Sequence, residues 1–291
     1  MDSSRVVLIT GCSSGFGYRT ALLFARKGYV TYASVRDIKS DGAKKLQEFV
    51  LKEQLSLHVI EIDVTNDLSV KKGITEILKS ENRIDILVNN AGRGYHGAIE
   101  EFSIEEIIQQ YQINIFGMLR MVQVVAPIMR RNKKGLIINI SSINGLIPFP
   151  MMGVYSSSKY AIETLTEVLR FELSHFGIKV TQIEPGTFLT EGYSKNVQSS
   201  KLSHLRTSPY YDVQHRFMLK MDSARERTLK SKLLVRILDP QRVANLIYTI
   251  SQKEHPKMRY RIGIDAHLYC FGKRILPERI WEWLLHGVYQ W

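Results

Sequence analysis

The sequence predicts a three-layer α/β fold, in which a doubly wound, seven-stranded parallel sheet lies between two layers of helices. Two observations predict it. Short apolar runs of strand length alternate with amphipathic helical patterns from Val6 to Asp265. Glycines and small polar residues follow several of these runs, and such sheets bind ligands beyond the carboxyl ends of their strands. We therefore expect one domain over residues 1–291, with a ligand site at that edge.

The first strand is predicted at Val6–Thr10, an apolar run that would be buried on both faces of a parallel sheet. It leads into the glycine-rich segment 10–17 (TGCSSGFG), and a helix follows at Thr20–Ala25 and closes near Gly28. Glycines let a backbone approach a pyrophosphate, and a helix N-terminus offers free N–H groups and a positive dipole end. The segment therefore predicts a dinucleotide site; the alternative is a plain strand-to-helix turn.

The end of the second strand, Tyr29–Val35, bears on the choice of dinucleotide. An acid there would accept the 2′-hydroxyl of NAD, whereas an arginine accommodates the 2′-phosphate of NADP. Ser34 stands where the acid would be expected, and Arg36 follows. A guanidinium matches phosphate geometry, so Arg36 favours NADP(H). Asp37 is a competing acid that leaves NAD(H) open, and Arg36 could also be an ordinary loop arginine.

The remaining elements continue the alternation. The small residues of Asn89–Gly92 would let a cofactor lie against the backbone, and the Asn amides can brace neighbouring strands. Asn114 falls inside a long helical pattern, where asparagine is unfavourable, and proves nothing alone. Helices are expected at 39–55, 68–78, 104–129, from after 153 to 175, and from 239; strands are expected at 57–62, 84–88, 136–140, 178–183 and 259–265.

Tyr155 and Lys159 form the central chemical pair. Four residues apart on a helix, they lie on the same face, so a phenol and an ammonium come within reach of each other. A phenol has a pKa of roughly 10, and a nearby positive charge favours the phenolate and lowers that pKa. The pair can therefore exchange protons near neutral pH. The same spacing also occurs on solvated helices.

Two segments depart from the strand–helix alternation. Residues 189–238 are polar, basic and irregular, with several short helical pieces, and are predicted to form a lid inserted over the site. Residues 266–291 form a C-terminal extension with an apolar helix at 275–285 and three tryptophans, Trp281, Trp283 and Trp291. The extension could lie on a membrane surface, pack on a partner subunit or close the pocket.

Composition limits the class of protein. The 291 residues are 44% hydrophobic and 23% charged, with a formal net charge of +12. No run of 18 or more apolar residues occurs, so no membrane-spanning helix is expected. Cys12 and Cys270 show no metal-ligand spacing and suit a reduced, cytoplasmic setting without disulfides or a metal. The positive charge alone would allow a nucleic-acid partner, but the basic residues are scattered and form no recognised binding motif, so none is expected.

With these residues the chain resembles the short-chain dehydrogenase/reductase family as far as about Asp265. The shared motifs are TGCSSGFG (10–17), Asp63, NNAG (89–92), Asn114, Ser142 at 13 residues before Tyr155, YSSSK (155–159), and a Pro-Gly step followed by Thr190. The strand end Ser-Val-Arg-Asp, NNAGxG and the C-terminal RYRxGxDA and Leu-Pro segments are similar to the 17β-hydroxysteroid and retinol dehydrogenase group. The chain departs from the family pattern at Phe16, which replaces an aliphatic residue, and at Glu184 before the Pro-Gly step.

The resemblance implies a Rossmann fold and carbonyl–alcohol interconversion by hydride transfer. Tyr155 would exchange the proton, Lys159 would hold the nicotinamide ribose and lower the tyrosine pKa, and Ser142 would orient the substrate oxygen. Asn114 would help hold a water linked to Lys159. The implied cofactor contacts are Gly11, Ser13, Ser14, Gly15, Phe16, Gly17, Arg36, Asp63, Val64, Asn90, Ala91, Gly92, Tyr155, Lys159, Pro185, Gly186, Thr187, Phe188 and Thr190.

An apolar pocket would suit a lipophilic substrate such as a steroid, a retinoid or another lipid. Its candidate lining residues, each of which could equally be core, are Phe149, Met151, Met152, Phe188 and Tyr193. The alternative function is a protein that binds and senses NADPH without turnover. By analogy with the family, a homodimer or homotetramer is expected.

Overall fold

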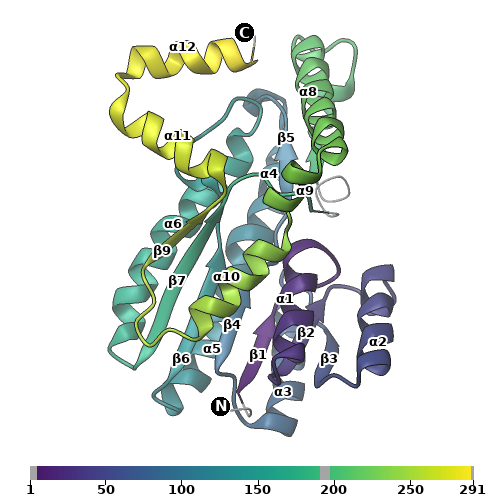
Figure 1. The fold of residues 1–291 in the computed structure, drawn as a ribbon, viewed down its shortest axis with the longest axis vertical. Helices are drawn as coiled ribbons and strands as arrows, with labels where there is room; N and C mark the ends of the chain where they lie inside the picture. Colours follow the sequence, from purple (N-terminus) through teal and green to yellow (C-terminus); the bar gives the residue numbers. More distant parts are fainter. Residues whose placement is uncertain (1–4, 191–196, 290–291) are drawn as a thin grey trace.

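The computed structural model describes residues 5–190 and 197–289. Its centre is the predicted sheet of seven parallel strands, in the order β3-β2-β1-β4-β6-β7-β9 (Figure 1). The strands are β1 (Val6–Ile9), β2 (Val30–Val35), β3 (Leu57–Glu61), β4 (Ile86–Asn89), β6 (Gly135–Ile140), β7 (Ile178–Pro185) and β9 (Arg259–Ile262). β1, β4 and β6 are buried along their whole length, which explains why their sequences are apolar without alternation.

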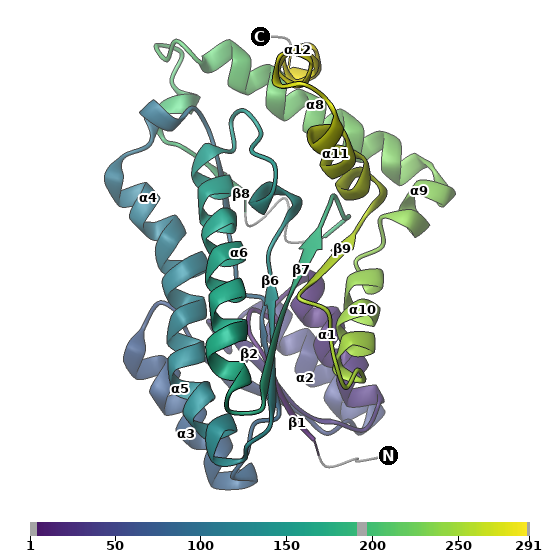
Figure 2. The ribbon, with the colours of Figure 1, turned by 90° about the vertical axis from the view of Figure 1, so that its left-hand side faces the viewer.

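Helices cover both faces of the sheet (Figure 2). Val7 and Ile9 of β1 face α1 (Gly15–Arg26), α2 (Asp41–Glu53) and α10 (Gln241–Ser251). Val6 and Leu8 point to the other face, which is covered by α3 (Asp67–Glu81), α5 (Gly117–Arg131) and α6 (Gly153–Ser174). Each such aliphatic side chain contributes roughly 1.5–3 kcal/mol on burial, so alternate residues of one strand hold both helical layers.

The strand order reverses at β1, because the chain runs outward through β2 and β3 and then returns to β4 on the other side. In doubly wound sheets a crevice opens at this point, outside the carboxyl ends of the two strands. The glycine-rich segment after β1 and the NNAG segment after β4 therefore meet at the predicted edge.

The helical pattern expected at 104–129 is observed as α4 (Ile104–Tyr111), a π-helical turn (Gln112–Phe116) and α5 in succession. By length and composition, Ile104–Arg131 is long and apolar enough to cross a membrane, unlike the expectation from the sequence. However, 56% of the 18-residue apolar stretch within this segment is buried inside the molecule, and Val125 and Met129 are fully buried. This burial is typical of a core helix.

The segment predicted as a lid differs from its prediction, and its residues 197–238, which lie over the carboxyl edge of the sheet, are called the cover below. Instead of several short pieces, it contains the 20-residue helix α8 (Tyr211–Lys230), followed by α9 (Lys232–Ile237). A second, two-stranded parallel sheet, β5 (Gly94–His96) with β8 (Val197–Ser199), was not predicted. α8 escaped prediction because it is polar almost all round and buries few side chains, among them Phe217.

The C-terminal segment also differs in its boundaries. β9 ends at Ile262, three residues before the expected end, because Gly263 has φ +117° and α11 (Ile264–Ile275) begins after it. The single helix expected at 275–285 is wrong. Pro277 has no backbone N–H to donate, so it cannot continue α11, and α12 (Glu278–Tyr289) starts after it.

Candidate active site

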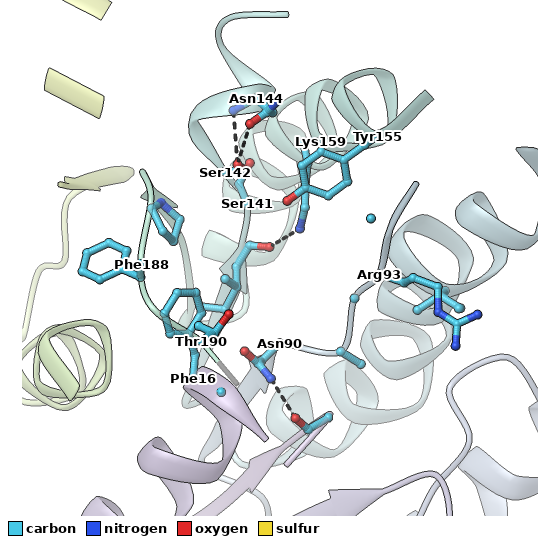
Figure 3. Close-up of a pocket in the computed structure, with 18 of the residues that line it drawn as sticks. Phe16, Asn90, Arg93, Ser141, Ser142, Asn144, Tyr155, Lys159, Phe188 and Thr190 are labelled. Atoms are coloured by element: carbon cyan, nitrogen blue, oxygen red, sulfur yellow. Dashed lines mark hydrogen bonds between the residues drawn. The ribbon is translucent and has the colours of Figure 1, made fainter. Parts of the chain in front are cut away.

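A cavity of about 1380 Å³ opens at the carboxyl ends of the strands, beneath α8. It is lined by all the predicted catalytic and cofactor-binding residues except Gly17 and Asn114. Figure 3 shows labelled side chains converging from the glycine-rich segment (Phe16), from the ends of β4 (Asn90), β6 (Ser142) and β7 (Phe188 and Thr190), and from α6 (Tyr155 and Lys159). Segments far apart in the chain are thus brought to one place, as the sequence predicts.

The glycine-rich segment forms a cradle that larger residues would fill. Gly11 has φ +70°, and a Cβ on it would lie 2.8 Å from the Cα of Ala91. A Cβ on Gly17 would lie 2.5 Å from both the Gly11 carbonyl oxygen and Asn90 Nδ2. α1 begins at Gly15, and the side chain of its N-cap, Ser14, makes no capping hydrogen bond. The cradle and the first-turn N–H groups therefore fit the pyrophosphate of a dinucleotide.

Asparagines brace the strands around this cradle, as predicted. Asn90 Nδ2 donates to the carbonyl oxygens of Thr10 (2.8 Å) and Gly11 (3.1 Å). Deeper in the sheet, Asn89 Nδ2 donates to Asn139 Oδ1 at 2.9 Å, and Asn139 Nδ2 donates to Thr166 Oγ1 of α6 at 2.9 Å. The chain of amides ties β1, β4, β6 and α6 together, which fixes the glycine-rich segment relative to the helix that carries Tyr155 and Lys159.

At the ribose end, Arg36 and Asp37 both line the cavity. Asp37 Oδ1 already accepts the backbone N–H of Lys39 at 2.8 Å. Within the described part of the chain, the exposed Arg36 makes no hydrogen bond or ion pair. Asp63 Oδ1 accepts from the N–H and the hydroxyl of Thr65, at 2.9 and 2.8 Å, and so orders the turn that carries Val64. Arg36 is therefore the group with donors to spare for a phosphate.

Tyr155 and Lys159 lie on the same face of α6, as their spacing predicts (Figure 3). Lys159 Nζ is 5.7 Å from the centre of the Tyr155 ring and donates to the Ile140 carbonyl oxygen at 2.9 Å. Ser142 follows β6, and its hydroxyl accepts from the Asn144 N–H at 3.2 Å. The end of β6 thus presents a carbonyl to the lysine and a hydroxyl beside the phenol.

Burial has the largest effect on the pKa values of Tyr155 and Lys159. It raises the pKa of Tyr155, against a smaller lowering effect of Ser142, so the predicted lowering by Lys159 is not what the structure gives. Burial lowers the pKa of Lys159 to about 8, against the opposing charge of Glu163. The reason is that Lys159 is buried and Tyr155 is partly buried in the cavity wall, so the protein shields the charged form of each from water. Tyr155 consequently holds its proton as a phenol in this arrangement.

Asn114 lies in the π-helical turn, beside the cavity and not on its wall. Its Oδ1 accepts the N–H of Arg93 at 2.9 Å, and its Nδ2 donates to the Arg93 carbonyl and the Ser158 hydroxyl, each at 3.0 Å. A Cβ on Gly92 would lie 3.4 Å from Asn114 Oδ1 and 3.9 Å from Lys159 Nζ. Asn114 therefore holds the segment after β4 close to the lysine, while its part in holding a water stays a prediction.

The segment after β7 is held by a residue that sequence reasoning missed. Asp265, from the first turn of α11, accepts the Thr187 N–H at 2.7 Å and lies against Gly186, where no side chain would fit. Phe188 packs edge-on against Phe16, with ring centres 5.7 Å apart, and Thr190 lies beside Gly15. The expected end of β9 hid this role, because it placed Asp265 in a strand.

The part of the cavity beneath α8 is lined by apolar side chains and by two cations of α8, Lys220 and Arg227. Phe149 and Met152 line it as predicted, whereas Met151 is buried in a cluster with Ala98 and Phe217, and Tyr193 lies outside the described residues. Sequence reasoning missed further lining residues on β5, α8 and α11, namely His96, then Phe217, Met221 and Ala224, and finally Tyr269. The helical spacing of residues 217, 221 and 224 was the one available signal for the α8 face. No group of His, Cys, Asp and Glu residues that could hold a metal occurs within 5–190 and 197–289.

Comparison with known proteins places this geometry in a family. The family described as short chain dehydrogenase matches residues 5–201. The 3-ketodihydrosphingosine reductase of Bacteroides thetaiotaomicron is 34% identical, covering 98% of each chain. The NADPH-dependent 3-dehydrocapnine reductase of Ornithobacterium rhinotracheale is 31% identical, covering 95% of this chain and 94% of the relative. The 17-beta-hydroxysteroid dehydrogenase type 1 of Mus musculus is 33% identical, covering 88% and 72%.

Solved structures agree in fold. A short-chain dehydrogenase from Streptomyces avermitilis superposes with a TM-score of 0.77 at 30% identity, over 94% of this chain and 93% of that one. ElxO with NADP bound gives 0.70 at 25% identity, over 89% and 97%. A short-chain dehydrogenase/reductase from Burkholderia phymatum in complex with NAD gives 0.75 at 25% identity, over 97% and 95%. The chain therefore belongs to the short-chain dehydrogenase family, with similarity to its steroid dehydrogenases, and is an NAD(P)-dependent oxidoreductase acting on the CH–OH/C=O pair.

Proposed function

We propose that the protein uses NADP(H) to interconvert a ketone and an alcohol on a lipophilic substrate, with Tyr155 as the proton donor and acceptor. One observation carries this proposal: Ser142, Tyr155 and Lys159 line the same cavity as the glycine cradle and the apolar wall. The nicotinamide supplies or accepts the hydride when bound.

The chain's own residues handle the proton and the orientation. In reduction, the Tyr155 hydroxyl donates its proton to the substrate oxygen, and burial, which favours the phenol form, suits that direction. Ser142 offers a second hydrogen bond to the same oxygen. Lys159, held by the Ile140 carbonyl, has two further N–H donors for the ribose hydroxyls of the cofactor. Asn114 is a catalytic residue in this proposal through a water beside Lys159.

The apolar wall supports a lipid-like substrate. Phe149, Met152, Phe217 and Met221 can surround a hydrocarbon chain or ring, and methionine adapts to varied shapes. Relatives named for ketodihydrosphingosine, dehydrocapnine and a steroid agree with this class. We favour reduction of a ketone on such an amphiphile.

Initial rates on a carbonyl panel test the function. The panel pairs long-chain 3-keto amphiphiles, keto-steroids and retinal with small polar ketones, each with NADPH. We expect kcat/KM higher by at least about tenfold for the lipophilic set, since even one methylene in an apolar pocket is worth about 10-fold or more. Better turnover of the polar set would contradict the substrate class. Tight NADPH binding with no turnover of any carbonyl would instead support a sensor.

The cofactor preference is assigned to Arg36. Fluorescence titration should give tighter binding of NADPH than of NADH, and Arg36→Ala should remove most of that difference because the guanidinium pairs with the 2′-phosphate. Lys39→Ala, a nearby exposed cation that does not line the cavity, is the matched control and should keep the preference. A preference for NADH that Arg36→Ala leaves unchanged would show that Asp37 governs the site.

We also propose that residues 1–291 act as one catalytic domain, with 189–238 as the lid and 266–291 as an extension.

The exposed side chains of α11 include Ile264, Leu268, Phe271 and Ile275, which fall on one helical face, and Trp283 of α12 is exposed too. This face supports peripheral membrane contact by a cytoplasmic protein. Flotation with anionic liposomes should recover the full chain and lose the variant in which Leu268 and Phe271 are both replaced by aspartate, which removes the centre of this face; equal recovery would favour a protein partner.

A further inference from the structure

A buried acidic residue continues the catalytic face of α6. Tyr155, Lys159 and Glu163 follow each other at steps of four residues, so their side chains lie in one row. Glu163 is buried and lines no part of the cavity. The end of β6 runs along the same row, where Ser142 lies beside Tyr155, the Ile140 carbonyl accepts from Lys159, and Ser141 interacts with Glu163.

Glu163 is tied on its far side to the edge of the sheet. Its Oε2 accepts from Gln182 of β7 and from Arg259 Nε of β9 (3.3 Å). Arg259 also reaches Glu167 at 2.8 Å and Glu184 at 3.5 Å, and Arg261 reaches Glu184 at 3.2 Å. Two arginines thus hold three acids, of which Glu184 is fully buried.

A structural ion pair between α6 and β9 would need only Glu167 and Arg259, because both are partly exposed and already in contact. Glu163 adds a second, buried carboxylate, which is costly unless it is well paired. Its Oε1 lies buried without a hydrogen-bond partner of normal geometry, although the nearby Ser141 hydroxyl lowers its pKa. A costly, incompletely paired carboxylate one helical turn from the catalytic lysine points to a function.

We propose that Glu163 is a positioning residue for the active site, whose negative charge keeps Lys159 protonated and whose contact with Ser141 fixes the end of β6. The proposal rests on the roles given above to Lys159 and Ser142. Glu163 acts through these two residues and touches neither substrate nor cofactor.

The charged and titratable groups around Glu163 determine whether removing its charge raises or lowers the pKa of Lys159. They come from α6, β7, β9 and α11: Lys159, Tyr160, Glu167, Glu184, Arg259, Arg261 and Cys270. Burial raises the pKa of Glu163 to about 7 and lowers that of Lys159 to about 8. Glu163 therefore carries most of its charge where Lys159 loses its proton, and this charge raises the pKa of Lys159. Removing the charge must move the deprotonation of Lys159 to lower pH.

Trace labelling measures this directly and requires no turnover. The whole protein is treated with a trace of isotopic acetic anhydride across a pH series, and labelling of Lys159 is read by peptide mass spectrometry, with exposed Lys39 as the internal reference. We expect the midpoint of Lys159 labelling to fall by about one pH unit in Glu163→Gln, because an opposite charge in close reach shifts a pKa by about 1–3 units.

Glu167→Gln is the matched control, since it also removes an acid paired with Arg259 on the same helix. It should leave the midpoint unchanged. Equal shifts in the two variants, or no shift in Glu163→Gln, would overturn the proposal. If the Gln variant does not fold, Glu163→Met, which leaves no buried amide, takes its place. Failure of both to fold, while Glu167→Gln folds, would make Glu163 purely structural and would also overturn it.

The pH profile of kcat/KM for NADPH-dependent reduction provides the second readout. Its alkaline limb should move to lower pH in Glu163→Gln and stay in place in Glu167→Gln; an unmoved limb in both would contradict the proposal. If the wild-type protein turned over no carbonyl, the proposed function would fail, whereas the labelling midpoint would still decide the role of Glu163.

Discussion

At the residue scale, the phosphate cradle depends on close backbone contacts that leave no room for a side chain. Gly17 is the most closely packed of the three glycines in the segment, since its missing Cβ would meet the Gly11 carbonyl and Asn90 Nδ2 at 2.5 Å. Both neighbours are held in place, because Asn90 donates to the Thr10 and Gly11 carbonyls. The neighbours cannot move without losing the bracing of β1 to β4.

We therefore predict that Gly17→Ala destabilises the protein by about 1–3 kcal/mol, the usual cost of overpacking, and weakens NADPH binding. Urea unfolding and fluorescence titration measure the two effects. Gly287→Ala is the control, because Gly287 is helical with open space around it and should tolerate the methyl group. Unchanged cofactor affinity in Gly17→Ala would contradict the close fit of the cradle.

The proximity of the two proposed catalytic residues, Tyr155 and Lys159, was predictable at this scale because it is local in sequence. Tyr155 and Lys159 share a helix, so their proximity follows from helical geometry alone. The direction of the tyrosine pKa did not follow, because it depends on burial by residues distant in sequence. Asp265 was missed for a similar reason: only the fold reveals that α11 starts beside the end of β7.

At the scale of elements, the cover is attached through β5, β8 and α8. His96 of β5 lies edge-on to Phe217 of α8, with ring centres 5.3 Å apart, and burial lowers the pKa of His96 to about 4. The packed cover therefore holds His96 neutral, whereas an opened cover would let it protonate near 6.5. Below about pH 6.5 the open state gains a proton that the packed state does not, so the cover loses stability as pH falls toward 4. Above pH 6.5 the effect is absent.

We predict faster opening of α8 at pH 5.5 than at pH 7.5, measured as lower protection of its amides against hydrogen exchange after correction for the intrinsic exchange rate at each pH. In His96→Phe, which keeps an aromatic ring but cannot take up a proton, this pH dependence should be reduced. The same acceleration in both proteins would show that another group controls the cover.

The sheet was largely predictable and the cover was not, for physical reasons. Buried parallel strands such as β1 and β6 have to be apolar along their length, so their sequences identify them. α8 packs a few side chains over a cavity and leaves the rest in water, so it has little hydrophobic periodicity to detect. β5 and β8 pair over a long sequence separation through backbone bonds, which three-residue strands do not encode.

At the scale of the whole molecule, one face carries exposed apolar side chains that a monomer would leave in water. Phe171, Val168 and Tyr160 are exposed on α6, and Phe116 is exposed in the π-helical turn between α4 and α5. Figure 2 shows α6 beside α4 and α5. Burying such a face between copies is the usual way to stabilise a homo-oligomer. The sequence could suggest an oligomer only by family analogy; the structure identifies the candidate face.

We predict that Phe171→Asp shifts the protein toward the monomer in sedimentation velocity, because the carboxylate would be buried without a partner. Phe171 is 67% exposed in the single chain. Leu51→Asp on α2, where Leu51 is 80% exposed, is the matched control and should leave the oligomeric state unchanged. A monomeric wild type would exclude the oligomer. Equal behaviour of the two variants would place the contact between copies on another face.

The most direct test of the account replaces Tyr155 with phenylalanine and follows hydride transfer from NADPH to the best carbonyl of the panel in a single turnover. The ring is retained and only the hydroxyl is lost, so NADPH affinity and thermal stability should stay close to those of the wild type. We predict that the transfer rate falls by about 10²–10⁴-fold, the usual contribution of a positioned proton donor. A rate equal to that of the wild type in the folded, NADPH-bound variant would contradict the account.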